Sequence, residues 1–327
     1  MKGTVTPSPT LSGGAVRNGS PGHTRLGLGV GMDLPWGAPI GFDPKRGRVT
    51  DRVEKFLKRR VRDYGYLFFA FQPRGASALA VENYVPAYEH LRDLLPPGLP
   101  WAFHHTMLNL GTVQEYDRAS VYEFTNSLIE RFGFRWVVED IGIWSMGGLS
   151  LPYPQPPYFV REALDVVVDN VSEARRTLTA PLHIEFPGVT DKVTAVVGDM
   201  DAYDYFTELA ERADAWVTLD VGHLIGWRWL KGKQGAELFT DLDRLPLERC
   251  RELHLSGCGI VRGKFLDLHH GVLMDEQLDL CELLLERCPN LLGVTYEDPR
   301  YDASGRMVDK SVPNYEKLQR LVGRWAV

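Results

Sequence analysis

Residues 216–224 read Trp-Val-Thr-Leu-Asp-Val-Gly-His-Leu. The run begins with apolar and β-branched side chains, which is typical of a buried strand, and it places Asp220 and His223 toward its end. We therefore predict a strand over residues 216–224 that ends in polar side chains. Short apolar runs, each followed by a longer amphipathic segment, recur along the chain from residue 25 onward.

This alternation predicts the fold class. The predicted strands cover residues 26–31, 66–72, 101–110, 136–144, 182–186, 216–224, 252–256 and 291–296. The predicted helices cover residues 52–63, 84–95, 119–132, 157–178, 202–213 and 275–287. In a chain of 327 residues this order favours a single α/β domain, a (β/α)8 TIM barrel. A doubly wound open sheet is the alternative, because periodicity alone does not show that a sheet closes.

Composition limits the domain organisation and the partners. Residues 1–24 are rich in Gly, Ser, Thr and Pro, so we predict a disordered leader followed by a catalytic domain over residues 25–327. The net charge of −6 gives no basic excess that would indicate nucleic-acid binding. Because no run reaches roughly 18 apolar residues, we expect no membrane span. The four cysteines form no CxxC pair, which favours reduced thiols in the cytoplasm.

Histidines and carboxylates gather at or just beyond the ends of the predicted strands. In a TIM barrel the carboxyl ends of all strands meet at one face, so side chains placed there converge. Converging carboxylates repel one another unless a cation compensates them. Imidazole and carboxylate donors together suit iron, zinc or manganese better than calcium, and we expect roughly two or three ions. The donors are His104, His105, Glu139, Asp140, His183, Glu185, Asp220, His223, His254, Asp267, His269, His270, Glu297 and Asp298.

Structural roles are the competing interpretation of these residues. A single histidine at a strand end is more often hydrogen-bonded within the fold, whereas donors on five or more strands favour a metal site. The glycines of Gly27–Gly31 lack the full GxGxxG spacing and a following lysine. We therefore predict a closely packed first strand there instead of a phosphate-binding loop.

Several of these segments are similar to motifs of a known family. Residues 252–257, ELHLSG, are close to its His-Leu-Ala-Gly motif, and residues 267–269, Asp-Leu-His, match its Asp-Thr-His. Further similar segments are His104–Gly111, Val138–Asp140, Ile184–Pro187 and Leu219–His223. From about residue 26 to about residue 300 the chain resembles the multinuclear non-haem iron-dependent oxidative enzymes, TIM-barrel enzymes that modify peptides and include the methanobactin-biosynthesis iron enzyme. This resemblance implies a xylose-isomerase-like barrel.

With this resemblance we predict the ligand set, in which Glu139 and Asp267 also have catalytic roles. The predicted metal ligands are His104, Glu139, Asp220, His223, His254, Asp267, His269 and Glu297. Glu185, Asp140 and His183 are further candidates, as ligands or as residues that orient them. His105 would face away from His104 on a strand, so we expect it to be structural.

The chain departs from the family pattern in three places. After the first strand the usual ligand histidine is absent, and Asp33 is the only candidate donor there. Asp140 stands where a histidine is common, and Phe186 stands where an asparagine is common. Because each change removes or moves a donor, we expect about two irons rather than three.

The resemblance also implies an activity. It is that of an Fe(II)/Fe(III) oxidase that uses dioxygen to modify a precursor peptide, at cysteine, in ribosomal peptide natural-product biosynthesis. Hydrogen would be removed from the cysteine carbon next to sulfur, and a leader-peptide-binding partner protein would recruit the peptide. The alternatives are a divalent-metal isomerase or phosphodiesterase of the xylose isomerase or endonuclease type, and a binding protein without catalysis. The missing basic excess argues against the endonuclease.

Overall fold

Eight parallel strands close into a barrel in the computed structural model of the chain. The structure describes residues 24–33, 42–43, 48–60, 63–70, 79–191, 193–269, 273–297, 299–308 and 311–326. The predicted leader, apart from Thr24, lies outside these ranges, as do His270, Asp298 and the side chain of Asp33. The order around the barrel is β1-β14-β11-β10-β9-β6-β5-β4, and this closure rules out the doubly wound open sheet.

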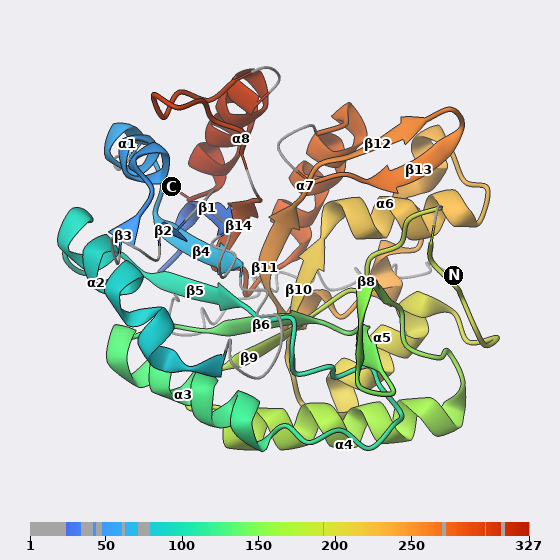
Figure 1. Ribbon diagram of the computed structural model, residues 1–327. Helices are drawn as coiled ribbons and strands as arrows, with labels where there is room; N and C mark the ends of the chain where they lie inside the picture. Colours follow the sequence, from blue (N-terminus) through green and yellow to red (C-terminus); the bar gives the residue numbers. More distant parts are fainter. Residues whose placement is uncertain are drawn as a thin grey trace, which may run out of the picture.

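The barrel strands are short and are surrounded by helices (Figure 1). Their bounds are β1 Gly27–Asp33, β4 Tyr66–Ala70, β5 Trp101–His104, β6 Val137–Asp140, β9 Leu182–Glu185, β10 Trp216–Asp220, β11 Cys250–Leu255 and β14 Gly293–Tyr296. The helices are α1 Asp51–Arg60, α2 Val85–Leu94, α3 Ala119–Phe132, α4 Arg161–Thr177, α5 Ala202–Arg212, α6 Val221–Leu230, α7 Asp275–Arg287 and α8 Ser311–Ala326. The alternation of strands and helices confirms the predicted fold class.

The helices α6 and α8 were not predicted, and α6 shortens the strand predicted over residues 216–224. The strand β10 ends at Asp220, whose side chain accepts a hydrogen bond from the backbone nitrogen of His223 at 2.8 Å. This contact caps the first turn of α6, because an aspartate before a helix satisfies one of its free N–H groups. His223 therefore lies on a helix that starts directly at the barrel rim.

Two hairpins follow barrel strands at their carboxyl ends. The hairpin of β7 (Ile143–Met146) and β8 (Leu149–Gln155) comes after β6, so the strand predicted over residues 136–144 is two strands. The hairpin of β12 (Cys258–Val261) and β13 (Lys264–Asp267) comes after β11. Both hairpins therefore leave the barrel at the end where the predicted donors lie. The remaining elements are the strands β2 Phe42–Asp43 and β3 Arg48–Val49 and the 3-10 helices η2 Val81–Asn83, η3 Gly235–Phe239, η4 Leu242–Arg244 and η5 Leu247–Arg249.

Side chains inside the barrel form a small core of their own, made of Tyr66, Phe68, Ala102, Trp136 and Val138. Residues of opposite phase on the same strands pack against the helices in the larger core. A Cβ atom on Gly29 would lie 2.3 Å from the ring of Tyr66. The glycine run of β1 thus leaves room for this ring, as expected for a closely packed first strand.

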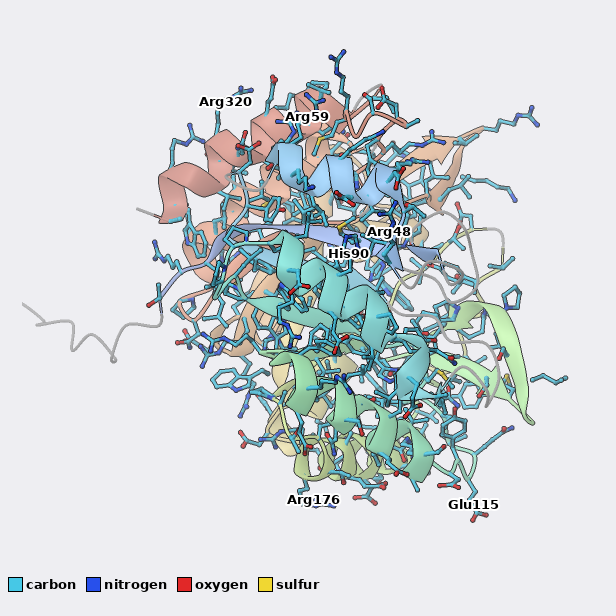
Figure 2. The ribbon with its side chains drawn as sticks, turned by 60° about the vertical axis from the view of Figure 1, so that its left-hand side comes forward. Arg48, Arg59, His90, Glu115, Arg176 and Arg320 are labelled. Atoms are coloured by element: carbon cyan, nitrogen blue, oxygen red, sulfur yellow. The ribbon has the colours of Figure 1, made fainter. Side chains whose placement is uncertain are left out.

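Charged residues cover the outer faces of the helices. In Figure 2, Arg176 of α4 and Arg320 of α8 lie at the edge of the molecule, and they are exposed, as is Arg59 of α1. Such amphipathic helices turn their apolar stripes to the strands and their charged side chains outward. Among the helices that the structure describes, none is long and apolar enough to cross a membrane.

Candidate metal centre

Two groups of buried donors lie at the carboxyl end of the barrel. The first group is His104, Glu185, His254 and Glu297, and the second is Asp140, Glu185 and His223. Within each group, one donor atom of every residue lies within 4.8 Å of the others. Glu185 belongs to both groups, so two bound ions would share this carboxylate.

The strands deliver these side chains because their residues alternate between the inside and the outside of the barrel. His104, Asp140 and Glu185 each end a strand in the inward phase, while Glu297 directly follows β14. Asp140 and Glu185 are also paired in the register of β6 and β9. Two neighbouring buried carboxylates are costly unless positive charge lies between them.

In the first group the imidazoles lie close to the carboxylates. His104 Nε2 is 3.1 Å from Glu185 Oε2 and 3.4 Å from Asp140 Oδ2. His254 Nδ1 is 3.1 Å from Glu185 Oε1 and 2.9 Å from Glu297 Oε1. Because both rings point a nitrogen at Glu185, this carboxylate is the centre of the group.

A rim of further donors lies beside these groups. Asp267 Oδ2 is 3.6 Å from His223 Nε2, and Asp267 Oδ1 is 3.4 Å from His269 Nε2. His269 Nδ1 is in turn 3.6 Å from Glu297 Oε2. Tyr153 donates a hydrogen bond to Asp267 Oδ2 at 3.0 Å. The rim therefore connects the second group to the first through Asp267 and His269.

The pKa values of the site indicate which positive charges a bound cation would replace. Burial alone would lower the pKa of His104, but contacts with Asp140 and Glu185 raise it to about 10. Burial would raise the pKa of Glu185, but His254 and His104 hold it well below its usual range. In the metal-free protein, protons on the imidazoles thus balance the negative charge of the carboxylates. A bound metal ion would displace these protons.

The donor set fits iron. It mixes imidazole and carboxylate ligands, which suit this metal, and it is buried at the base of two hairpins. Asp267 Oδ1 is buried and has no hydrogen-bond partner among the residues that the structure describes. A buried oxygen of this kind is costly unless another group binds it. The site therefore offers ligands that suit iron, and Oδ1 of Asp267 is available to a bound ion.

The structure does not bring the predicted ligand Glu139 into either group. It follows Val138 and precedes Asp140 on β6, so it faces the opposite side of the strand. Its Oε2 accepts a hydrogen bond from the backbone nitrogen of Leu108 at 2.8 Å, and His105 Nδ1 lies 3.7 Å away. Burial raises the pKa of Glu139 to about 8. Its neighbour Asp140, ranked lower in the sequence analysis, points inward.

Three other candidate donor residues make structural contacts around the site. Asp220 caps α6 and also accepts from the backbone nitrogen of Ser256 at 3.3 Å, so it positions the turn that carries His223. His183 stacks on Trp136 with ring centroids 5.9 Å apart. His105 contacts Thr125 of α3 at 2.9 Å. None of these residues belongs to the two groups.

Two residues near the site were missed by the sequence analysis. Glu252 lies inside the barrel two positions before His254, and the period of two along a strand would have placed both on one face. Tyr153 reaches Asp267 from β8, and no signal in the sequence indicates this contact.

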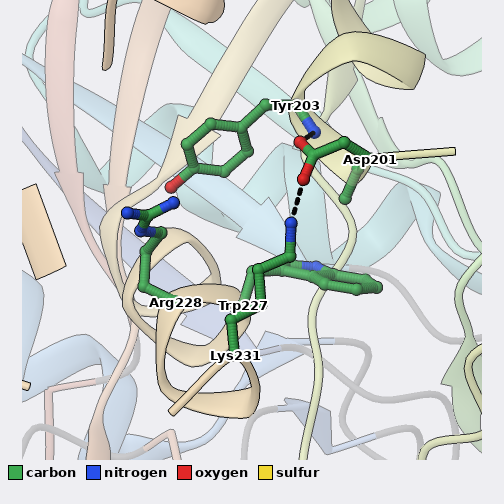
Figure 3. A pocket seen from close by; sticks show the side chains of 6 residues that line it. Asp201, Tyr203, Trp227, Arg228 and Lys231 are labelled. Carbon is green, nitrogen blue, oxygen red and sulfur yellow. Dashed lines mark hydrogen bonds and ion pairs between the residues drawn. The ribbon is translucent and has the colours of Figure 1, made fainter. Parts of the chain in front are cut away.

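A separate shallow pocket lies between the start of α5 and the end of α6 (Figure 3). Asp201 and Lys231 form an ion pair across it, and Tyr203, Trp227 and Arg228 complete its wall. The pocket contains no member of the two donor groups, and Arg228 pairs with Asp241 outside it.

Comparisons with known proteins identify the family of the chain. The family described as RiPP precursor modification enzyme MbnB/TglH/ChrH matches residues 78–305. A UPF0276 protein of Caulobacter vibrioides is 22% identical over 193 residues, 59% of this chain and 67% of that protein. A UPF0276 protein of Anaeromyxobacter sp. is 23% identical over 214 residues, 65% of this chain and 73% of that protein.

Solved structures share the fold. A xylose isomerase domain protein from Alicyclobacillus acidocaldarius superposes with a TM-score of 0.53 at 15% identity, covering 91% of this chain and 99% of that chain. Endonuclease IV from Thermus thermophilus gives a TM-score of 0.50 at 18% identity, with the same coverage. These likenesses show a xylose-isomerase-like TIM barrel. The family match spans well over half of the sequence, and the chain therefore belongs to the MbnB/TglH/ChrH family of RiPP precursor modification enzymes.

Proposed function

We propose that this enzyme is an iron-dependent oxidase that uses dioxygen to modify a precursor peptide at a cysteine. One observation carries the proposal: two buried groups of imidazole and carboxylate donors share Glu185, in a chain of a peptide-modifying family. A precursor peptide is the proposed substrate, and a leader-peptide-binding protein is the proposed partner.

The residues that would hold the ions follow from the two groups. The first ion would bind His104, Glu185, His254 and Glu297, and the second would bind Asp140, Glu185 and His223. Asp267 and His269 lie beside both groups, where they can complete the ligand set. When bound, iron would supply the redox chemistry that couples dioxygen reduction to oxidation of the peptide.

The protein itself supplies an ionised carboxylate at the rim. Burial would raise the pKa of Asp267, but His269 and His223 lower it well below its usual range. The carboxylate is therefore ionised at neutral pH, and its Oδ1 has no hydrogen-bond partner within the described part of the chain. An ionised carboxylate with such a low pKa is a weak base, but it can accept a hydrogen bond from the substrate and orient it beside the ions.

The hairpins indicate where a peptide would approach. The β7–β8 and β12–β13 hairpins leave the barrel beside the donors, and they expose the apolar residues Leu149, Ile260 and Val261. Exposed apolar side chains on the hairpins can contribute contacts to a bound peptide. The peptide would pass between these hairpins to reach Asp267.

The test combines metal analysis with a peptide assay. Protein purified without oxygen is analysed for iron per chain and is then mixed with a cysteine-bearing peptide encoded beside its gene. We expect stoichiometric iron and an oxygen-dependent change of peptide mass that is absent when serine replaces the cysteine. Zinc-loaded protein is the control, because zinc occupies similar ligands without redox chemistry. Protein that takes up no iron, or a mass change that persists without oxygen, would contradict the proposal.

A further inference from the structure

A carboxylate lies inside the barrel below the first donor group. Glu252 of β11 is 1% exposed and has the same inward phase as His254. Its Oε1 accepts hydrogen bonds from the hydroxyl groups of Tyr66 at 2.9 Å and Thr295 at 2.6 Å. Its Oε2 accepts from the indole nitrogen of Trp136 at 2.6 Å. Three neutral donors therefore fix the carboxylate in one orientation.

The ring of His254 lies between this carboxylate and the donor group. Nδ1 faces Glu297 at 2.9 Å and Glu185 at 3.1 Å, while Nε2 lies 3.5 Å from Glu252 Oε1. Phe68 packs edge-on against the imidazole with the ring centroids 4.5 Å apart. The ring is therefore held with one nitrogen toward the proposed ion and the other toward Glu252.

A histidine that binds a metal through one nitrogen carries its proton on the other. A carboxylate next to that second nitrogen favours the proton there, and it also makes the metal-binding nitrogen more basic. In this barrel Glu252 is placed to favour the proton on Nε2 of His254. The lone pair of Nδ1 then faces the centre of the first group.

We propose that Glu252 is a positioning residue for the metal centre, which fixes the tautomer of His254 so that Nδ1 binds the ion. The inference rests on the proposed function, because it needs an ion in the first group. It also explains the composition of the barrel interior. The core around Glu252 is aromatic and aliphatic. Burying a carboxylate there is costly unless it interacts with a positively charged group.

The experiment measures Co(II) binding by visible absorption and chelator competition in the full-length protein. For Glu252→Gln we expect one of the two binding events to weaken by about 10–100-fold, the usual effect of removing such a partner. Thr218→Val is the matched control, since Thr218 pairs with Glu252 in the register of β10 and β11 and its buried hydroxyl group has no hydrogen-bond partner among the described residues. We expect its Co(II) affinity to stay within about twofold of the wild-type value.

The outcomes separate this inference from the proposed function. If the wild-type protein binds no Co(II) or iron, the metal centre itself is wrong. If the wild-type protein binds metal and Glu252→Gln binds it equally well, only the role of Glu252 is overturned. If Glu252→Gln does not fold, nitrogen-15 spectra of the zinc-loaded wild-type protein show which nitrogen of His254 binds the metal and which carries the proton. We expect His254 to be metal-bound at Nδ1 and protonated at Nε2, and binding through Nε2 would overturn the inference.

Discussion

The hydroxyl group of Tyr153 on β8 donates a 3.0 Å hydrogen bond to Oδ2 of Asp267 on β13. This contact connects the two hairpins that follow β6 and β11, and it lies beside His223. The phenol leaves the other carboxylate oxygen of Asp267 facing the rim. One hydrogen bond therefore joins the two hairpins and orients the Asp267 carboxylate.

The variant Tyr153→Phe tests this contact. Loss of the hydrogen bond frees the Asp267 side chain to rotate, so we expect peptide turnover to fall by about 10-fold while iron content stays near the wild-type value. Tyr158→Phe, which removes a hydroxyl group from the segment after β8, serves as control and should keep full turnover. Equal turnover in wild-type protein and Tyr153→Phe would show that the contact is dispensable.

Neighbouring residues of β6 provide a test of the site assignment. Asp140 faces the donors, whereas Glu139 faces Leu108 and His105 outside the barrel. We expect Asp140→Asn to lose the ion of the second group, seen as roughly half of the wild-type iron per chain. Glu139→Gln should keep its iron and lose stability instead, because Glu139 binds the backbone of Leu108 in the loop after β5. The reverse pattern in metal analysis would return Glu139 to the ligand set.

Metal affinity should depend on pH. The pKa of His104 is raised to about 10 in the metal-free protein, so its ring is protonated at neutral pH and the ion must displace that proton. Affinity therefore rises with pH, by up to about tenfold per pH unit for each proton released. Chelator competition between about pH 6 and about pH 8 measures this slope. A flat profile would mean that His104 does not give up a proton to the metal.

Glycines at two positions make a matched pair for stability. In Gly29→Ala the new methyl group meets the ring of Tyr66, and we expect a loss of about 1–3 kcal/mol in the free energy of unfolding. Gly323 lies at an exposed position of α8, and a methyl group there would meet open space, so Gly323→Ala should stabilise by up to about 1 kcal/mol. Urea unfolding of both variants checks the signs. If Gly29→Ala has the same free energy of unfolding as the wild-type protein, the ring of Tyr66 can move aside.

Much of the fold could be predicted because its periodic signals are strong. The helices predicted over residues 119–132 and 275–287 have the bounds that α3 and α7 show. The helix α6 was missed because Val221–Arg228 is buried on all sides, so the sequence has no polar face that would distinguish a helix from a strand. For α8 the amphipathic signal was present, with Tyr315, Leu318 and Val322 on its buried face.

The choice between Glu139 and Asp140 was beyond the sequence. A strand exposed on one side alternates between apolar and polar residues, and that alternation reveals its phase. In β6 both Val137 and Val138 are fully buried, one against the helices and the other inside the barrel. Two acidic residues then follow with nothing in the pattern to show which one points inward.

The last donor of the first group has a consequence for how the enzyme matures. Glu297 directly follows β14, and the barrel closes only when β14 pairs with β1 and β11. Translation releases the N-terminal part of a chain first, so His104 and Glu185 leave the ribosome long before Glu297 does. A nascent chain therefore holds only a fragment of the ligand set. The metal of the proposed centre would therefore enter the finished polypeptide, after β14 has joined the barrel.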